Sequence, residues 1–234
     1  MTYKYPRVLV ATPTYEGKDY VFKENFEAIK NLSYPNYEYI YLDNTKGPNY
    51  AAKLRRRGAK VVRVPRGRNS RDALSNAQNY ARQKCLEEGF DYLLFVESDL
   101  LPPPDTIQRL MSHNKLAVGA TYFIGTEGIS LPCIFFKEYN KELKSYGSRV
   151  IHSDEVMNFL GTGVRSCFGC GVGVMLIKRS LVEKFKFWHD ERFPNRHSDV
   201  WWNYDLDHAR IPMFVDTDFV VDHRPSKWTN VKDR

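Results

Sequence analysis

Two carboxylates in the tripeptide Glu97-Ser98-Asp99 are the strongest candidates for chemistry in this sequence. They follow the apolar run Tyr92 to Val96, which has the composition of a buried β-strand. Two acids separated by one residue, where the chain turns, can face the same ligand. Mg²⁺ and Mn²⁺ prefer oxygen ligands and are usually held by one or two carboxylates together with substrate phosphate. The tripeptide therefore indicates a divalent-metal site, although acid-x-acid triplets are also frequent on exposed surfaces.

Two side chains in the C-terminal half could complete such a site. A neutral imidazole at His223 could ligate a metal together with Asp99. Asp199 precedes Val200-Trp201-Trp202, an aromatic-rich stretch predicted to be helical, and could act as a general base if a partly buried site adjusts its pKa. The alternatives are structural, since a single histidine is usually not a ligand. Asp199 or Ser198 could also be the N-cap of a helix.

Further polar side chains follow the other predicted strands. Asp43 closes the apolar run Tyr37 to Leu42 and could accept hydrogen bonds from a base or sugar, or could be a turn residue. Three arginines, Arg66, Arg68 and Arg71, come after a third run. Guanidinium groups fork onto phosphate oxygens, so these side chains could bind a diphosphate; the alternative is a solvated loop.

The basic character of the chain is local. The 234 residues carry a net charge of +7, with a pI near 9.1. Residues 53–72 hold nine lysines and arginines against one acid, Asp72, a net charge of +8, so the rest of the chain is close to neutral. Such a stretch indicates nucleic acid, phosphate or another acidic partner, or a solvated face.

Composition excludes several classes of protein. Hydrophobic residues make up 42% and charged residues 27% of the chain, which is ordinary for a globular domain. No apolar run approaches the ~18 residues that would span a bilayer, and the N-terminus has no signal-like core. With few cysteines for its length, the chain is expected in the reducing cytoplasm.

A Cys-x-x-Cys motif raises the possibility of zinc or redox chemistry. It has no second pair at zinc-ribbon spacing, so buried structural thiols are the favoured interpretation. The glycines within residues 169–173 are expected to let the backbone approach a ligand closely. The four cysteines are Cys85, Cys133, Cys167 and Cys170.

Alternating apolar and helical patterns predict an α/β domain with a mainly parallel central sheet flanked by helices. A possible helix cap at Ser70 and a stop at Gly89 bound the longest helix. Ligands of such sheets bind beyond the carboxyl ends of the strands, where four polar clusters should meet. The predicted strands are 7–11, 37–42, 61–64 and 92–96, and the helices 19–31, 49–57 and 70–88.

The C-terminal half is less regular in pattern. Residues 125–165 are mixed and polar, and we expect an irregular insertion or lid there. No linker or repeat divides the chain, so a single domain over residues 1–234 is predicted. The other expected elements are helices at 105–112, 179–185 and 199–209, and strands at 116–122, 169–178, 213–215 and 219–221.

In order and spacing, these motifs resemble the GT-A glycosyltransferases, particularly the inverting family 2 group. Val8 to Tyr15 is similar to the family's first strand and donor loop, and Tyr39 to Asn44 to its second strand. Asn69 to Ala81 is similar to the helix after the third strand. Glu97-Ser98-Asp99 stands in the place of the metal-binding DxD. The Gly-rich strand from Phe168, and the 24 residues separating Asp199 from His223, also match the pattern.

The resemblance implies transfer of a sugar from a nucleoside-diphosphate donor, with a UDP-sugar as the first guess, to an acceptor hydroxyl with inversion. It implies a donor half at 1–104 and an acceptor half at 105–234. Asp199 would be the base, and Asp99 and His223 would hold Mn²⁺ or Mg²⁺ with help from Glu97. The donor-binding residues implied are Thr12, Pro13, Tyr15, Asp43, Arg68, Arg71, Glu97 and Ser98.

The sequence departs from the family pattern at two positions. Glu97 replaces the first Asp of the DxD, and Ser198 replaces the family's Glu before the base.

Alternative functions and acceptors also stay open. A nucleotidyltransferase would need a Gly-rich basic loop after the first strand, which Thr12 to Tyr15 does not supply. A nucleic-acid-binding module would use residues 53–72, which lack interleaved aromatics for base stacking. The acceptor could be a polysaccharide, a protein or an acidic substrate such as modified DNA.

Overall fold

The computed structural model describes residues 5–126, 129–141, 144–193 and 196–225. The start of the N-terminal segment, for which no signal-like core is expected, lies outside these residues. Within them, no helix is both long and apolar enough to cross a membrane.

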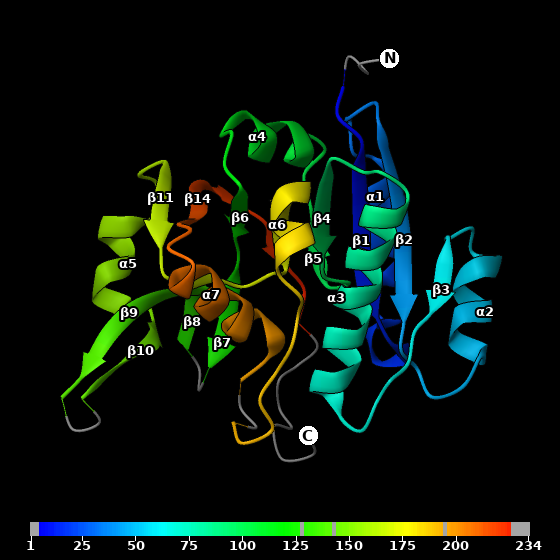
Figure 1. The fold of residues 1–234 in the computed structure, drawn as a ribbon. Helices are drawn as coiled ribbons and strands as arrows, with labels where there is room; N and C mark the ends of the chain where they lie inside the picture. Colours follow the sequence, from blue (N-terminus) through cyan, green and yellow to red (C-terminus); the bar gives the residue numbers. More distant parts are fainter. Residues whose placement is uncertain (1–4, 127–128, 142–143, 194–195, 226–234) are drawn as a thin grey trace.

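An eight-stranded sheet runs through the centre of the molecule (Figure 1). Its order is β11-β14-β6-β13-β4-β1-β2-β3, and all strands are parallel except β11 and β13. This confirms the predicted α/β class with a mainly parallel sheet. The strands are β1 (Val8–Thr14), β2 (Tyr37–Asp43), β3 (Val61–Arg63), β4 (Tyr92–Val96), β6 (Ala117–Thr121), β11 (Val164–Cys167), β13 (Val174–Lys178) and β14 (Met213–Val220).

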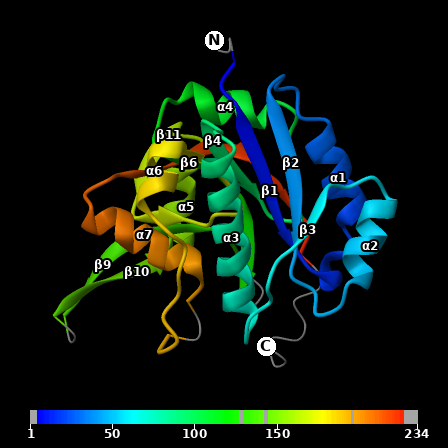
Figure 2. The same ribbon diagram turned by 45° about the vertical axis from the view of Figure 1, so that its right-hand side comes forward.

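Helices cover both faces of the sheet because its central strands are apolar on both sides. In β1, Val8 and Val10 pack with α1, α2 and α4, whereas Leu9 and Ala11 pack with α3, α6 and α7. Figure 2 shows α3, α6 and α7 in front of the sheet and α1 and α2 on its right, beside β2 and β3. The helices are α1 (Phe22–Lys30), α2 (Asn49–Arg56), α3 (Ser70–Glu87), α4 (Thr106–Ser112), α6 (Arg179–Lys184) and α7 (Ser198–His208).

The ends of the helices follow local chemistry. Gly58 and Gly89 after α2 and α3 have φ of +90° and +71°, a conformation that favours glycine. The cap of α3 is Asn69, whose side-chain oxygen accepts hydrogen bonds from the backbone N–H groups of Arg71 and Asp72. The prediction of Ser70 as the cap is therefore wrong by one residue.

The expectation of an irregular insertion at 125–165 is also wrong. This region forms two short antiparallel pairs, β7 with β8 and β9 with β10, then a helix and β11. Such strands expose one side to water, so their composition is polar and resembles a loop. The additional elements are β7 (Phe123–Thr126), β8 (Ile129–Pro132), β9 (Ile134–Asn140), β10 (Ser145–Val150), α5 (Ser153–Phe159) and β12 (Gly169–Cys170), which pairs with β9.

The Gly-rich segment before β13 admits protein side chains rather than a ligand, which corrects the expectation for these glycines. A Cβ at Gly171 would lie 1.9 Å from the hydroxyl of Tyr122 and 2.7 Å from Cys133 Sγ. A Cβ at Gly173 would lie 2.6 Å from a methyl group of Leu100. These glycines are needed because the interior is filled to their backbone.

The strand predicted as two pieces at 213–215 and 219–221 is one strand, β14, with a register shift after Asp216. The Asp216 side chain is only 1% exposed. Arg109 donates to it at 2.8 and 3.2 Å, and His113 Nε2 lies 2.8 Å away. Burial would raise the pKa of Asp216, but these two partners lower it below the ordinary value.

We therefore expect Asp216→Asn to destabilise the protein by about 1–3 kcal/mol at neutral pH, because a buried, charge-assisted set of hydrogen bonds is lost. A lowered folded-state pKa contributes stability above the unfolded value, about 3.8, and loses it as pH falls through the folded value. The difference in free energy of unfolding between wild type and variant should therefore become smaller only below about pH 4. Urea unfolding at pH 7 and pH 3 checks this, with the exposed Asp154→Asn as control. An unchanged midpoint at pH 7 would contradict it.

Candidate active site

The carboxyl ends of β1 and β2 are tied together into one polar surface. Thr14 pairs with Asp43 at the end of the two strands. The backbone N–H of Thr45 donates to Asp43 Oδ1 at 2.9 Å, and Thr45 Oγ1 accepts from the N–H of Glu16 at 2.9 Å. The loops after the two strands are thereby joined, as expected for polar clusters that follow parallel strands.

Two buried oxygens at this edge lack a hydrogen-bond partner among the described residues. Asp43 is fully buried, yet its Oδ2 is unpartnered, and so is Oγ1 of Thr12 in β1. A buried polar atom without a partner costs about 1–3 kcal/mol, so such pairs of atoms mark places where a ligand supplies the missing partners. Pro13 follows Thr12 in β1 and is buried. Tyr15 comes just after β1 and is 37% exposed. The same edge of the sheet, where the ends of β1 and β2 are joined, therefore carries Thr12, Pro13, Tyr15 and Asp43.

The turn from β4 into β5 (Leu100–Leu101) carries the Glu97-Ser98-Asp99 tripeptide. Its backbone is fixed from two sides. Glu97 N–H donates to the carbonyl of Gly173 at 2.7 Å, and Asn25 of α1 donates to the carbonyls of Glu97 and Leu100 at 3.2 and 2.7 Å. Ser98 and Asp99 are buried. The carboxylates are therefore held on a rigid support.

His223 reaches this turn through a two-residue strand, β15 (Asp222–His223). β15 pairs with β5 so that His223 stands opposite Leu100, the residue after Asp99. Nε2 of His223 lies 3.3 Å from Asp99 Oδ2, and Nδ1 lies 2.6 Å from the carbonyl oxygen of Phe123. Because a carbonyl only accepts, Nδ1 carries a proton, and in the neutral ring the lone pair of Nε2 faces Asp99. A histidine anchored in this way is typical of metal ligands.

Lys18, which no sequence motif singled out, also contacts Asp99. It ends a short 3₁₀ helix, η1 (Glu16–Lys18), directly after β1. Its ammonium forms an ion pair with Asp99 Oδ2, the oxygen that faces His223. The only available signal is its position in the loop after a predicted strand, since Asp99 is 81 residues away in the chain.

The charges of this cluster shift its protonation equilibria. Burial would raise the pKa of Asp99, but hydrogen bonds from His223 and Lys18 lower it below the ordinary value. Burial would lower the pKa of both partners, yet Asp99 raises the pKa of Lys18 and of His223. Glu97 behaves differently, because burial and the nearby charge of Asp99 raise its pKa to about 7. The two carboxylates of the tripeptide are therefore unequal: Asp99 stays ionised while Glu97 is partly protonated near neutral pH.

Asp199 lies in the first turn of α7, near enough to Glu97 for the two charges to interact. Burial raises its pKa, and its charge in turn helps to raise the pKa of Glu97. Its Oδ1 accepts the N–H of Val200 at 2.8 Å. Ser198 is buried and donates to Gln78 of α3, and the N-cap position belongs to His197. Ser198 and Asp199 are thus not caps, and Ser198 instead anchors α7.

The basic stretch at 53–72 is divided among α2, β3 and the start of α3, and several of its side chains already have partners within the fold. Lys53 and Arg57 both pair with Asp19, at 2.6 and 3.2 Å. Arg68 is 70% exposed and pairs with Asp72 at 3.1 Å and with Glu191. Arg71 is partly buried in the first turn of α3. Any phosphate bound by Arg68 would therefore replace existing carboxylate partners.

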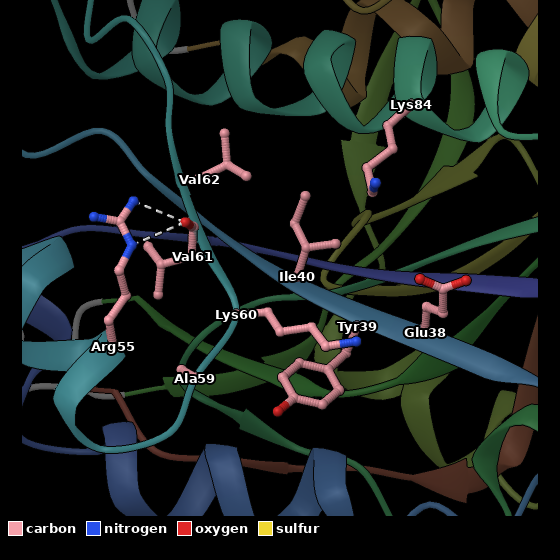
Figure 3. A pocket seen from close by; sticks show the side chains of 9 residues that line it. All are labelled: Glu38, Tyr39, Ile40, Arg55, Ala59, Lys60, Val61, Val62 and Lys84. Atoms are coloured by element: carbon pink, nitrogen blue, oxygen red, sulfur yellow. Dashed lines mark hydrogen bonds between the residues drawn. The ribbon is translucent and has the colours of Figure 1, made fainter.

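A pocket of about 360 Å³ lies away from the tripeptide, beside the first half of β2 (Figure 3). Arg55 and Lys60 of the basic stretch line it, but Arg55 donates to the carbonyl of Val61 at 2.9 Å and Lys60 lies 5.7 Å from the ring centre of Tyr39. The full lining is Glu38, Tyr39, Ile40, Arg55, Ala59, Lys60, Val61, Val62 and Lys84.

The chemistry of Asp99 and His223 fits a divalent ion, since a carboxylate and an anchored imidazole are common ligands. Across the described ranges, no group of three or more His, Cys, Asp or Glu side chains could hold a metal by themselves. Water or substrate phosphate would supply the remaining oxygen ligands, as is usual for Mg²⁺. The same finding leaves Cys167 and Cys170 without a zinc site in this part of the chain, and all four cysteines are free thiols.

Known structures share this architecture at low sequence identity. The mannosyltransferase PcManGT from Pyrobaculum calidifontis, in complex with GDP-Man and Mn²⁺, has a TM-score of 0.60 and 16% identity over 96% of this chain. GalNAc-T7 with UDP, GalNAc and Mn²⁺ has a TM-score of 0.63 and 12% identity over 94%. The chain spans 59% and 44% of those two proteins, respectively. No curated protein sequence matches the chain.

The family is shown by the sequence itself. Residues 9–128 match the profile described as "Glycosyl transferase family 2". The matched segment runs from β1 past β7 and contains Thr12, Asp43 and the Glu97-Ser98-Asp99 turn. It covers half of the chain, and the sheet order and the solved structures agree with the GT-A fold. The chain therefore belongs to glycosyl transferase family 2 and is a glycosyltransferase with the GT-A fold.

Proposed function

We propose that the protein is a metal-dependent, inverting glycosyltransferase that moves a sugar from a nucleoside-diphosphate donor to an acceptor hydroxyl. The observation that carries this is the meeting of Asp99 with His223 at the end of β4. It lies at the same sheet edge as the unpartnered carboxylate oxygen of Asp43 at the end of β2. One position suits a metal-bound diphosphate, and the other suits a nucleobase or ribose.

The donor would lie along the edge from β2 to β4. Its base and ribose would contact Asp43, Thr12, Pro13 and Tyr15. Two buried oxygens there, Asp43 Oδ2 and Thr12 Oγ1, have no hydrogen-bond partner among the described residues. Ser98 and Glu97 would face the ribose and diphosphate. We take a UDP-sugar as the first candidate; the two similar structures contain GDP-Man and UDP, respectively. In this proposal the donor half comprises residues 1–104 and the acceptor half residues 105–234.

Asp99 and His223 would hold Mn²⁺ or Mg²⁺, with Glu97 assisting. The ion, when bound, supplies a Lewis acid for the diphosphate oxygens. Arg71 and Arg68 would add positive charge at the end of the donor. For Arg68 this requires release from Glu191 and Asp72.

Asp199 would be the general base of the transfer. Its carboxylate takes the proton of the acceptor hydroxyl while the hydroxyl oxygen bonds to the anomeric carbon. The bond from that carbon to the diphosphate oxygen breaks, and its electron pair leaves with the nucleoside diphosphate. Attack from the face opposite the leaving group inverts the anomeric configuration. The raised pKa of Asp199 supports this role, because a more basic carboxylate is a better proton acceptor near neutral pH.

We also propose that the protein acts in the cytoplasm. All four cysteines are free thiols, including Cys167 and Cys170, which have two residues between them in the chain. Free thiols are usual in reducing compartments.

A donor panel tests the proposed function. With Mn²⁺ present, one nucleotide sugar should raise the melting temperature and be hydrolysed slowly, and a UDP-sugar is the first expectation. At 100 times the dissociation constant, binding stabilises by about 2.7 kcal/mol, which is about 5–10 °C for a chain of this size. Asp43→Asn should abolish the shift, because Asp43 is the proposed base contact, whereas the exposed Asp154→Asn should keep it. Equal melting temperatures with every donor would contradict the proposal.

A further inference from the structure

We propose that Lys18 is an internal competitor of the metal ion, a proposal that rests on the metal site of the proposed function. In the absence of donor, the Lys18 ammonium neutralises Asp99. When a metal and a nucleoside diphosphate bind together, Lys18 leaves Asp99 and pairs with the diphosphate. Lys18 would thus make metal binding depend on the nucleotide.

The position of Lys18 allows this movement. Its backbone is fixed, because its N–H donates to the carbonyl of Tyr15 at 2.9 Å within η1. Its side chain is 23% exposed, whereas those of Asp99 and His223 are 5% and 8% exposed. A lysine ammonium on a four-carbon stem can therefore change partners on the open side of the cluster while the two proposed ligands stay in place.

Lys18 and a metal ion cannot both use the same oxygen. The ammonium pairs with Oδ2 of Asp99, and this oxygen is also the one that lies 3.3 Å from His223 Nε2. An ion held between Asp99 and His223 would face a positive charge at contact distance in a largely buried site. Repulsion between like charges is strong where water is excluded. Metal binding therefore has to displace the ammonium.

The donor diphosphate is the natural second partner. Lys18 stands three residues after Tyr15, in the loop joined to the end of β2 through Glu16 and Thr45. The proposed diphosphate lies between that end and Asp99, so the ammonium can reach it without a change of backbone. Lysine commonly binds phosphate as a point charge. A nucleotide that attracts Lys18 frees Asp99 for the metal, and by linkage the metal strengthens nucleotide binding by the same factor.

Titration of Mn²⁺ into the protein, followed by the electron paramagnetic resonance signal of free Mn²⁺, tests this without any sugar transfer. Lys18→Met should bind Mn²⁺ alone about tenfold more tightly than wild type, and the gain in Mn²⁺ affinity on adding UDP or GDP, in separate series, should shrink by a similar factor. Lys18→Gln is a second neutral variant and should behave in the same way. Lys18→Arg keeps the charge and should resemble wild type.

Two controls separate the possible failures. Lys23→Met removes an exposed lysine of α1 and should leave Mn²⁺ binding unchanged. Asp99→Asn should weaken it strongly. If Asp99→Asn weakens binding but both neutral Lys18 variants bind Mn²⁺ alone as wild type does, the role of Lys18 is wrong and the metal site stands. If Asp99→Asn leaves Mn²⁺ binding unchanged, the proposed metal site itself is wrong.

Discussion

Asp199→Asn is expected to lower the rate of sugar transfer by about 10²–10⁴-fold and to leave donor binding intact. The amide keeps the size of the side chain and can still accept the N–H of Val200, but it cannot take a proton from the acceptor. The measurement is single-turnover transfer with the donor that the panel selects, alongside the donor-induced shift in melting temperature.

Two comparisons make the Asp199 result specific. Asp205→Asn alters another carboxylate of α7, one that accepts from Trp188 Nε1 at 2.7 Å, and should leave transfer largely unchanged. Ser198→Ala removes the contact with Gln78 and should lower stability rather than the chemical step. Wild-type turnover in Asp199→Asn would remove the assigned base.

Asp99→Asn should reduce kcat/KM by about 10³, because a bound metal is worth several kcal/mol to the departing diphosphate and about 4 kcal/mol corresponds to that factor. Among the residues that the structure describes, Asp99 is the carboxylate that contacts both His223 and Lys18. Replacing it removes a metal ligand and leaves two cationic or proton-donating groups facing an amide. The rate should be measured at saturating and at limiting Mn²⁺.

Chelation provides the matching control for Asp99. Wild-type protein treated with EDTA should lose transfer to a similar extent and regain it when Mn²⁺ is restored. Asp99→Asn should lose little more on chelation, since the two changes remove the same interaction and are not additive. If wild type keeps its rate after chelation and Asp99→Asn is also active, transfer needs neither the metal ion nor the Asp99 carboxylate.

Much of the fold could be predicted because the central strands carry strong local patterns. Tyr92 to Val96 is a strand over those residues, and β1, β2 and β3 lie where apolar runs end in polar clusters. Prediction failed where a strand is half exposed or interrupted. The described part of 125–165 forms two antiparallel strand pairs, a helix and the start of β11, and β14 looked broken because Asp216 is polar. In the fold that carboxylate is buried with Arg109 and His113, which no local pattern reveals.

The site was partly predictable for a similar reason. Asp43, Asp99 and Thr12 follow strands, and parallel strands bring such residues to one edge. His223 was a candidate because it follows a predicted strand and matches the family pattern, and the structure adds the pairing with β5 that places it beside Asp99. Lys18 also follows a strand, but that position alone does not single it out, because its ion pair with Asp99 forms only when β1 and β4 pair. The role of the glycines was missed because it depends on Tyr122, which reaches them from another strand end.

The two-residue pairing of β15 with β5 has a consequence for how the enzyme is made. Asp99 and His223 are 124 residues apart in the chain, so their contact closes one of the longest loops in the molecule. Contacts of high sequence separation form slowly, because loop closure costs entropy before any bond rewards it. During synthesis, β1 to β4 can assemble while the residues of β15 are still absent. The metal site should therefore form after most of the sheet has folded. The rate at which Mn²⁺ binding recovers would then measure the last step of refolding.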